Sequence, residues 1–131
     1  MNIGRAAAAT GVTAKRIRYY EQIGLLGKAK RSASGYRVFD RDDLHTLSFI
    51  RRARRLGFSV PKISALLALW QDQDRSSADV KRLVEAHLDE LREKIGELQA
   101  MVDTLQHLAD RCDGDRRPDC PILHDLQRSE S

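Results

Sequence analysis

The longest regular pattern of apolar and polar positions runs from residue 77 to 111, where no proline interrupts the chain. Apolar residues recur there at steps of three and four, which predicts one helix of 35 residues with a single apolar stripe. Heptads sustained over this length are typical of a coiled coil, and a chain of 131 residues is too short to cover such a stripe by itself. We therefore expect a homodimer with a two-fold symmetric interface. The predicted seam consists of Val84, Leu88, Leu91, Ile95, Leu98, Val102 and Leu105.

At the other end of the chain, apolar positions predict two short helices, at residues 3–9 and 14–23, around a tight turn. Thr13 is placed to cap the second helix and Gly24 to end it. Two short helices joined by a turn that contains glycine are typical of a helix-turn-helix, whose second helix reads DNA.

The second of these helices is basic, which favours a DNA-reading role. Ile17 and one of the two adjacent tyrosines are expected to face inward, while the charged positions face outward. The candidate DNA contacts on this helix are Lys15, Arg16, Arg18, Tyr19 and Tyr20.

Residues 28–39 change to an alternating pattern around a Ser-Gly pair, which predicts a small β-hairpin. Beside a helix-turn-helix, such a hairpin forms a wing that reaches the phosphate backbone, and Arg31, Tyr36 and Arg37 are its candidate contacts. The alternative for Tyr36 is that its ring packs the hairpin onto the helices.

Two further helices follow the hairpin. Asp40 is placed to cap a helix that runs to about Leu56, with Asp43 supporting its first turn. Four arginines between positions 51 and 55 end this helix. One interpretation is that their charge suits the negative end of the helix dipole. The other is that they contact a second stretch of DNA backbone, for which Arg54 is the candidate residue.

The next helix is expected to begin at Ser59 and Pro61, and to carry its apolar residues toward the core. Trp70 lies at helical spacing in this pattern and is expected to be a core residue. Residues 71–76 are polar and predict a linker.

Charge is divided unevenly along the chain. Residues 1–75 hold 15 Lys or Arg against 6 Asp or Glu, a net +9, and residues 76–131 hold 8 against 13, a net −5. The basic half favours a polyanionic partner, and nucleic acid over a membrane surface, because it contains no basic amphipathic helix with bulky apolar anchors. With no apolar run near the roughly 20 residues that cross a bilayer and no export signal, we expect a cytoplasmic protein without a membrane partner.

Both cysteines, Cys112 and Cys120, lie just beyond the predicted coiled coil. In a cytoplasmic protein two neighbouring thiols indicate a metal or redox site more than a structural disulfide. Two thiolates are too few for a zinc or iron–sulfur site, but they suit a soft monovalent ion such as Cu(I), Ag(I) or Au(I). His124 is expected to be structural, and His87 and His107 to be solvated helix residues.

Three segments of the N-terminal half carry a resemblance to a known family. They are Ile17-Arg18-Tyr19-Tyr20-Glu21, Gly35-Tyr36-Arg37 and Leu56-Gly57-Phe58. Together they closely resemble the MerR family of transcriptional regulators. The resemblance to this family extends over nearly the whole chain. The segment with Cys112, Gly114, Cys120 and Pro121 resembles the copper-efflux, Cu(I)-sensing branch of that family, the CueR-like regulators.

The resemblance implies a mainly α-helical fold in four parts. These are a winged helix-turn-helix domain with a β-hairpin wing at 1–39, two connector helices at 40–76, an antiparallel coiled-coil dimerisation helix at 77–111, and a metal-binding loop, short helix and tail at 112–131.

The resemblance also implies a mechanism, in which a dimer sits on promoter DNA whose spacer is too long for RNA polymerase. Metal binding then undertwists and bends the DNA and so activates transcription. In the divalent-metal branches a cysteine stands where this chain has Ser77, so one Cu(I) per subunit is the expected cofactor. Lys81, one turn later, resembles the group that offsets the negative charge of a bis-thiolate site.

One alternative from another class is a thiol redox regulator, in which Cys112 and Cys120 form a disulfide and the same DNA-binding half responds to oxidant. A drug-binding regulator needs a larger effector domain than the residues after 111 supply. An enzyme is the weakest interpretation, because no nucleophile–base pair, Gly-rich phosphate loop or pair of catalytic carboxylates is present. The resemblance therefore implies a DNA-binding activator of copper, silver or gold resistance genes.

Overall fold

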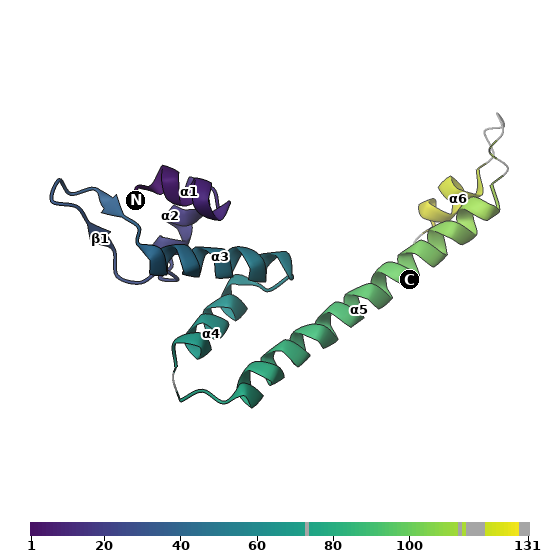
Figure 1. The fold of residues 1–131 in the computed structure, drawn as a ribbon. Helices are drawn as coiled ribbons and strands as arrows, with labels where there is room; N and C mark the ends of the chain where they lie inside the picture. Colours follow the sequence, from purple (N-terminus) through teal and green to yellow (C-terminus); the bar gives the residue numbers. More distant parts are fainter. Residues whose placement is uncertain (73, 113, 115–119, 129–131) are drawn as a thin grey trace. The chain divides into compact units, whose positions relative to one another are not determined.

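The computed structural model describes residues 1–72, 74–112, 114 and 120–128. It is mainly helical with one two-stranded antiparallel sheet, which confirms the predicted fold class (Figure 1). In chain order the elements are α1 (Ile3–Thr10), α2 (Ala14–Gln22), β1 (Lys30–Arg31), β2 (Arg37–Val38), α3 (Arg41–Arg55), α4 (Val60–Gln71), α5 (Ser77–Asp110) and α6 (Pro121–Gln127). The chain divides into two compact units, Met1–Lys81 and Arg82–Ser131, which we call the head and the stalk.

The helices of the head begin where their capping residues predict. The Thr13 side chain accepts from the backbone N–H of Arg16, and the Ser59 side chain caps α4 in the same way. Asp40 and Asp43 form a reciprocal capping box at the start of α3. Gly24, with φ +84°, ends α2 in the left-handed conformation that glycine adopts at low cost.

The core of the head lies where α1 packs against α2 and α3, and where α3 packs against α4. Its largest fully buried side chains are Ile17, Phe39, Leu47, Ile50 and Ile63. Phe39, directly after β2, also ties the wing to the start of the chain, because its backbone N–H donates to the Met1 carbonyl at 2.7 Å. The inward orientation expected of Ile17 is confirmed.

The wing is a short hairpin in which Lys30 pairs with Val38 and Arg31 with Arg37. Its turn is closed by the N–H of Ser32, which donates to the Tyr36 carbonyl at 2.8 Å. The Tyr36 side chain is 76% exposed, so the alternative that it packs the hairpin onto the helices is wrong.

Two side chains differ from their predicted environments. Trp70 is 44% exposed, because it lies flat on Phe49 with the ring centroids 5.1 Å apart and not inside the core. His87 is 5% exposed, whereas we predicted a solvated residue. Its spacing of three from Val84 and four from Leu91 places it on the same face of α5 as those apolar residues. His107 is exposed, as predicted.

The stalk is built on α5, one uninterrupted helix of 34 residues whose bounds match the prediction to within one residue (Figure 1). Most of the predicted seam is exposed along it, with Ile95 and Leu98 at 63% and 59%. The short helix α6 lies beside the last turns of α5, where Leu108 is buried. Within the described residues, no helix combines the length and apolar character that spanning a bilayer demands.

Candidate nucleic-acid interface and thiol site

The exposed face of α2 carries the basic residues that the sequence singled out. Lys15, Arg16 and Arg18 are exposed, and Tyr19 is 48% exposed beside them. Tyr20 is only 5% exposed, because it lies on the same face as Ile17 and fills the core. Of the two tyrosines, Tyr19 is therefore the one with a surface for direct contact with DNA, which corrects the prediction for Tyr20.

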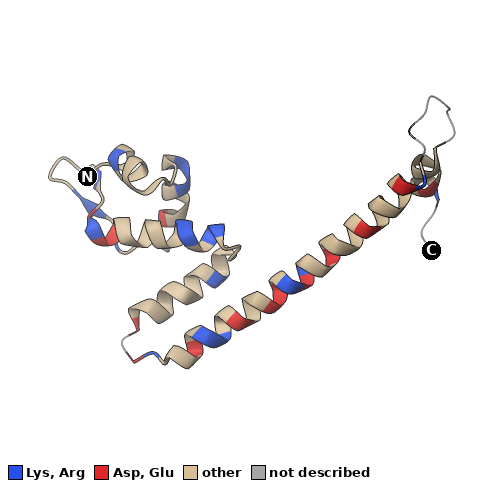
Figure 2. Cartoon of the chain, turned by 45° about the vertical axis from the view of Figure 1, so that its right-hand side comes forward, with Lys and Arg blue, Asp and Glu red and all other residues tan. Residues whose placement is uncertain are grey.

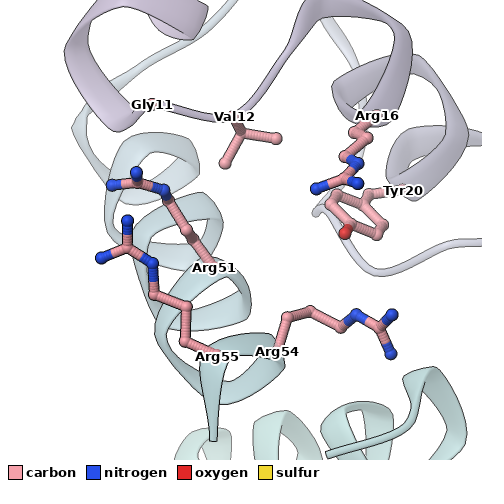
Figure 3. Close-up of a pocket in the computed structure, with 7 residues that line it drawn as sticks. All are labelled: Gly11, Val12, Arg16, Tyr20, Arg51, Arg54 and Arg55. Atoms are coloured by element: carbon pink, nitrogen blue, oxygen red, sulfur yellow. The ribbon is translucent and has the colours of Figure 1, made fainter. Parts of the chain in front are cut away.

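Four arginines from two distant segments meet in one pocket of about 370 Å³ on the head (Figure 3). Arg16 comes from α2, and the others come from the end of α3. Its lining residues are Gly11, Val12, Arg16, Tyr20, Arg51, Arg54 and Arg55. None of these seven residues is acidic, so the pocket concentrates positive charge without a carboxylate to balance it, which suits a phosphate group.

The turn of the helix-turn-helix helps to shape this pocket. Gly11 has φ +75°, a conformation that favours glycine. A Cβ there would lie 2.7 Å from Cζ of Arg51, so a larger residue would also push the guanidinium away from the turn. Arg54 is held by a hydrogen bond from Nη1 to the carbonyl oxygen of Phe58, at 3.1 Å. The sequence predicted Arg16 and Arg54 as DNA contacts on two different helices. It missed Arg51 and Arg55, because a run of arginines at residues 51–55 does not show which of them face α2.

The wing presents a second candidate surface for the DNA backbone. Arg31 is exposed and donates from Nη1 to the carbonyl of Gly35 at 3.2 Å, which holds its side chain along the hairpin. The Tyr36 side chain stands exposed on the same hairpin. Both residues are placed as a wing contact requires.

The sequence predicted that Arg37 presents its charge to solvent, but the structure places this charge inside the head. Its side chain is 13% exposed, with Nε 3.1 Å from Oε1 of Glu21 and Nη1 3.6 Å from Oδ2 of Asp43. Two carboxylates hold this guanidinium inside the head, so the prediction that Arg37 contacts phosphate is corrected.

The two thiols bracket the segment between α5 and α6, and both are half-buried. Cys112 follows the end of α5, where its N–H donates to the Ala109 carbonyl at 3.1 Å. Cys120 is the N-cap residue of α6, and its carbonyl accepts from the His124 N–H at 3.0 Å. Most of the predicted metal-binding loop, residue 113 and residues 115–119, lies outside the described residues.

Few potential metal donors of this segment belong to the described residues. Within the part of the chain that the structure describes, no cluster of three or more His, Cys, Asp or Glu side chains is able to hold a metal ion. Two thiols without a third ligand suit a soft ion of low coordination number and do not suit Zn²⁺, Mg²⁺ or Ca²⁺. Ser77, the first residue of α5, and Lys81 one turn later are both exposed.

Comparisons with known proteins agree with this geometry. The model of the MerR HTH family regulatory proteins matches residues 1–70, and the model described as MerR, DNA binding matches residues 44–108. The heavy metal-dependent transcription regulator 2 of Rhizobium meliloti is 55% identical over 126 residues, covering 96% of this chain and 86% of that protein. The transcriptional regulator CueR of Escherichia coli is 42% identical over 126 residues, covering 96% and 93%.

Two solved structures are also similar. The lead(II) complex of PbrR691 from Ralstonia metallidurans CH34 has a TM-score of 0.84 at 33% identity, covering 96% of this chain and 98% of that one. HiNmlR, a MerR family regulator bound to promoter DNA, has a TM-score of 0.60 at 25% identity, covering 84% and 83%. These relatives are transcriptional regulators and not enzymes, in agreement with the sequence analysis. The chain belongs to the MerR family of helix-turn-helix regulatory proteins, which bind DNA.

Proposed function

We propose that this chain is a promoter-binding activator of transcription that responds to one Cu(I), Ag(I) or Au(I) ion per subunit, bound by Cys112 and Cys120. The observation that carries the proposal is the donor set, two half-buried thiols with no third ligand grouped with them among the described residues. Two thiolates complete a linear site for a monovalent ion, whereas Zn²⁺ is left short of its usual four ligands. A metal response is supported by the heavy metal-dependent relative and by the lead(II) complex of PbrR691.

Ser77 supports the choice of a monovalent ion within this proposal. In the antiparallel dimer of this proposal, the start of α5 in one subunit lies near the thiols of the other, so a cysteine at position 77 would supply a third sulfur across the interface. This chain has the hydroxyl of Ser77 there instead. A bis-thiolate site with a monovalent ion keeps one net negative charge, which the ammonium of Lys81 from the other subunit is proposed to offset.

The functional form in this proposal is a homodimer that forms along the seam of α5. Its exposed apolar stripe is too extensive for a monomer in water, and a second copy of the helix would cover it. The four-part division at residues 39, 76 and 111 then separates DNA binding, connection, dimerisation and metal sensing. The dimer acts on promoter DNA in the cytoplasm and works with RNA polymerase.

DNA contact in this proposal involves both surfaces of the head. Lys15, Arg18 and Tyr19 on α2 meet the DNA, the four-arginine pocket seats a backbone phosphate, and Arg31 and Tyr36 on the wing hold a neighbouring stretch of backbone. The metal-free and the metal-bound dimer both bind, and metal changes the distortion of the promoter and not its occupancy.

Anaerobic titration of Cu(I) against a competing chelator tests the metal site, with X-ray absorption to count the sulfur neighbours. We expect two sulfur neighbours and loss of the copper response in Cys112→Ser and in Cys120→Ser, while His124→Gln serves as the matched control and keeps it. Zn²⁺ should neither compete nor activate, and Ser77→Cys should gain a response to Zn²⁺, Cd²⁺ or Hg²⁺.

Two results would contradict this proposal. One is equal activation of the unmodified protein by Zn²⁺. The other is a response to oxidant in metal-free buffer, which would favour the redox regulator with a disulfide between Cys112 and Cys120.

A further inference from the structure

We infer that Arg37 is a positioning residue, which fixes the wing relative to α2 and α3 and does not itself contact DNA. The inference rests on the proposed function in one respect, namely that the wing contacts DNA through Arg31 and Tyr36. In this inference Glu21 and Asp43 strengthen DNA binding, although both residues are acidic and the head binds a polyanion.

One guanidinium joins three elements of the head. Arg37 lies on β2, Glu21 lies in the last turn of α2, and Asp43 lies in the first turn of α3. Nε of Arg37 donates to Oε1 of Glu21 at 3.1 Å, and Nη1 lies 3.6 Å from Oδ2 of Asp43. The same Nη1 donates to the carbonyls of Lys30 and Val38, so both strands of the wing converge on this group.

The environment of Arg37 argues against a role at the phosphate backbone. Its Cζ lies 4.2 Å from the centroid of the Phe39 ring, and Phe39 is fully buried. Nη2 is buried and has no hydrogen-bond acceptor among the described residues, so the aromatic face takes part of its charge. Turning Arg37 outward would leave the buried Asp43 carboxylate without this partner, which costs more than one exposed phosphate contact returns.

A second pair of charges ties the wing to the same helix end. Lys30 of β1 forms an ion pair with Asp40, the N-cap of α3, and Asp40 and Asp43 are the two members of the capping box. Each strand of the wing is therefore attached to one acid of that box. A wing held in this way needs little ordering when it meets DNA, which lowers the entropic cost of binding.

The sign of one substitution separates positioning from direct contact. Glu21→Gln removes a negative charge beside a polyanion, so general electrostatics predicts tighter binding, whereas a positioning role predicts weaker binding. We expect DNA affinity to fall roughly tenfold, because the wing must then be ordered on binding. Asp42→Asn, an exposed acid in the same region of the head, is the matched control and should leave the affinity unchanged or slightly raised. Tighter binding by Glu21→Gln would overturn the inference.

Two further variants test whether the charge of Arg37 or its fork of donors matters. A phosphate contact accepts lysine, but two carboxylates on different elements need the planar guanidinium, so Arg37→Lys should bind as weakly as Arg37→Met. A wild-type affinity in Arg37→Lys would overturn the inference. All affinities are measured well below the unfolding midpoint of each variant, and Arg37→Lys and Glu21→Gln keep the test decisive where Arg37→Met does not fold.

A double-mutant cycle with the wing supplies a readout that a loss of stability alone does not move. In the otherwise unchanged protein, Arg31→Ala should weaken DNA binding and reduce the slope of log K against log salt by about 1.8, because each subunit of the dimer loses one phosphate contact worth about 0.9. In the Arg37→Met background the same change should have little further effect, because the wing is no longer held at the DNA. Additive effects would show that the two residues act independently and would overturn the positioning role.

The cycle also distinguishes failure of the proposed wing contact from failure of the positioning role of Arg37. If Arg31→Ala and Tyr36→Ala leave binding unchanged in the otherwise unmodified protein, the proposed wing contact fails and the inference fails with it. If both weaken binding while Glu21→Gln tightens it, the wing contact stands and only the positioning role of Arg37 is refuted.

Discussion

The head and the stalk bury their apolar residues in different ways. Each of the four helices α1 to α4 in the head contributes buried side chains, and the core of the head includes Phe39, Leu47 and Ile63. Along α5 only His87 and Leu108 are buried, although the helix is more than twice as long as any other described helix. The head is therefore stabilised within one chain, whereas the seam of α5 is left exposed, and in our proposal a second copy covers it.

Charge divides the molecule along similar lines (Figure 2). Lys and Arg gather on α2, on the wing strands and at the end of α3, while Asp and Glu recur along α5. Residues 1–75 carry +9 and residues 76–131 carry −5. Positive charge is therefore concentrated in the unit that folds around its own core.

The largest expected effect is loss of the dimer when the seam is charged. Ile95→Glu combined with Leu98→Glu should produce monomers, because two apolar contacts per subunit, each contributing about 1.5–3 kcal/mol, are replaced by buried like charges. The dissociation constant should rise at least a thousandfold, by roughly 1.4 kcal/mol per factor of ten. Sedimentation velocity measures it. Ala100→Glu, exposed on the same helix outside the seam, should remain dimeric.

The next effect concerns the core of the head. Phe39→Ala should lower the free energy of unfolding of the head by about 3–5 kcal/mol at any protein concentration, because it empties a fully buried site. Ile95→Ala should destabilise only through the dimer, so its effect should shrink on dilution. Urea unfolding followed by the fluorescence of Trp70, the one tryptophan of the chain, reports on the head. If the destabilisation by both variants depended equally on protein concentration, the head and the stalk would not differ in how they are stabilised.

A smaller effect is expected from the four-arginine pocket. Arg55→Ala should weaken promoter binding roughly tenfold and reduce the salt slope by about 1.8, because each subunit of the dimer loses one phosphate contact worth about 0.9. Fluorescence anisotropy at several salt concentrations gives both values. Arg92→Ala removes an exposed arginine from the acidic stalk and should change neither. An unchanged slope for Arg55→Ala would exclude the pocket from the interface.

The smallest effect is at the start of α3. Asp40→Ala removes one half of the capping box and the partner of Lys30, and it should lower the stability of the head by about 1 kcal/mol. A thermal melt by circular dichroism measures the loss. Asp42→Ala, in the same turn but outside the box, is expected to change the midpoint little, and a similar loss in both would point to the helix dipole and not to the cap.

Much of this fold is predictable because its signals are local. Thr13, Asp40 with Asp43, and Ser59 cap their helices through hydrogen bonds that span three residues, so the sequence around each predicts a helix start. The bounds of α5 follow from an apolar repeat that needs no other element to be recognised. The basic face of α2 and the two thiols after α5 are likewise readable from residue type and spacing.

The environment of individual side chains depended on contacts between residues far apart in the chain. The pattern placed one tyrosine inward, and only the packing of α2 in the head selected Tyr20 and left Tyr19 at the surface. Trp70 lies at a core-like spacing, yet its ring stacks on Phe49 near the surface, 21 positions earlier in the chain.

The arginines show the same division most clearly. As residue types, Arg16, Arg31, Arg37 and Arg54 are equal candidates for a phosphate, and the sequence alone determined that the N-terminal half is basic and helical. Only the tertiary structure placed Arg16 and Arg54 in one pocket without an acid and set Arg37 between Glu21 and Asp43. The physical reason is that charge and helix propensity belong to the residue and its near neighbours, whereas the partner of a charge is fixed by which distant segments pack together.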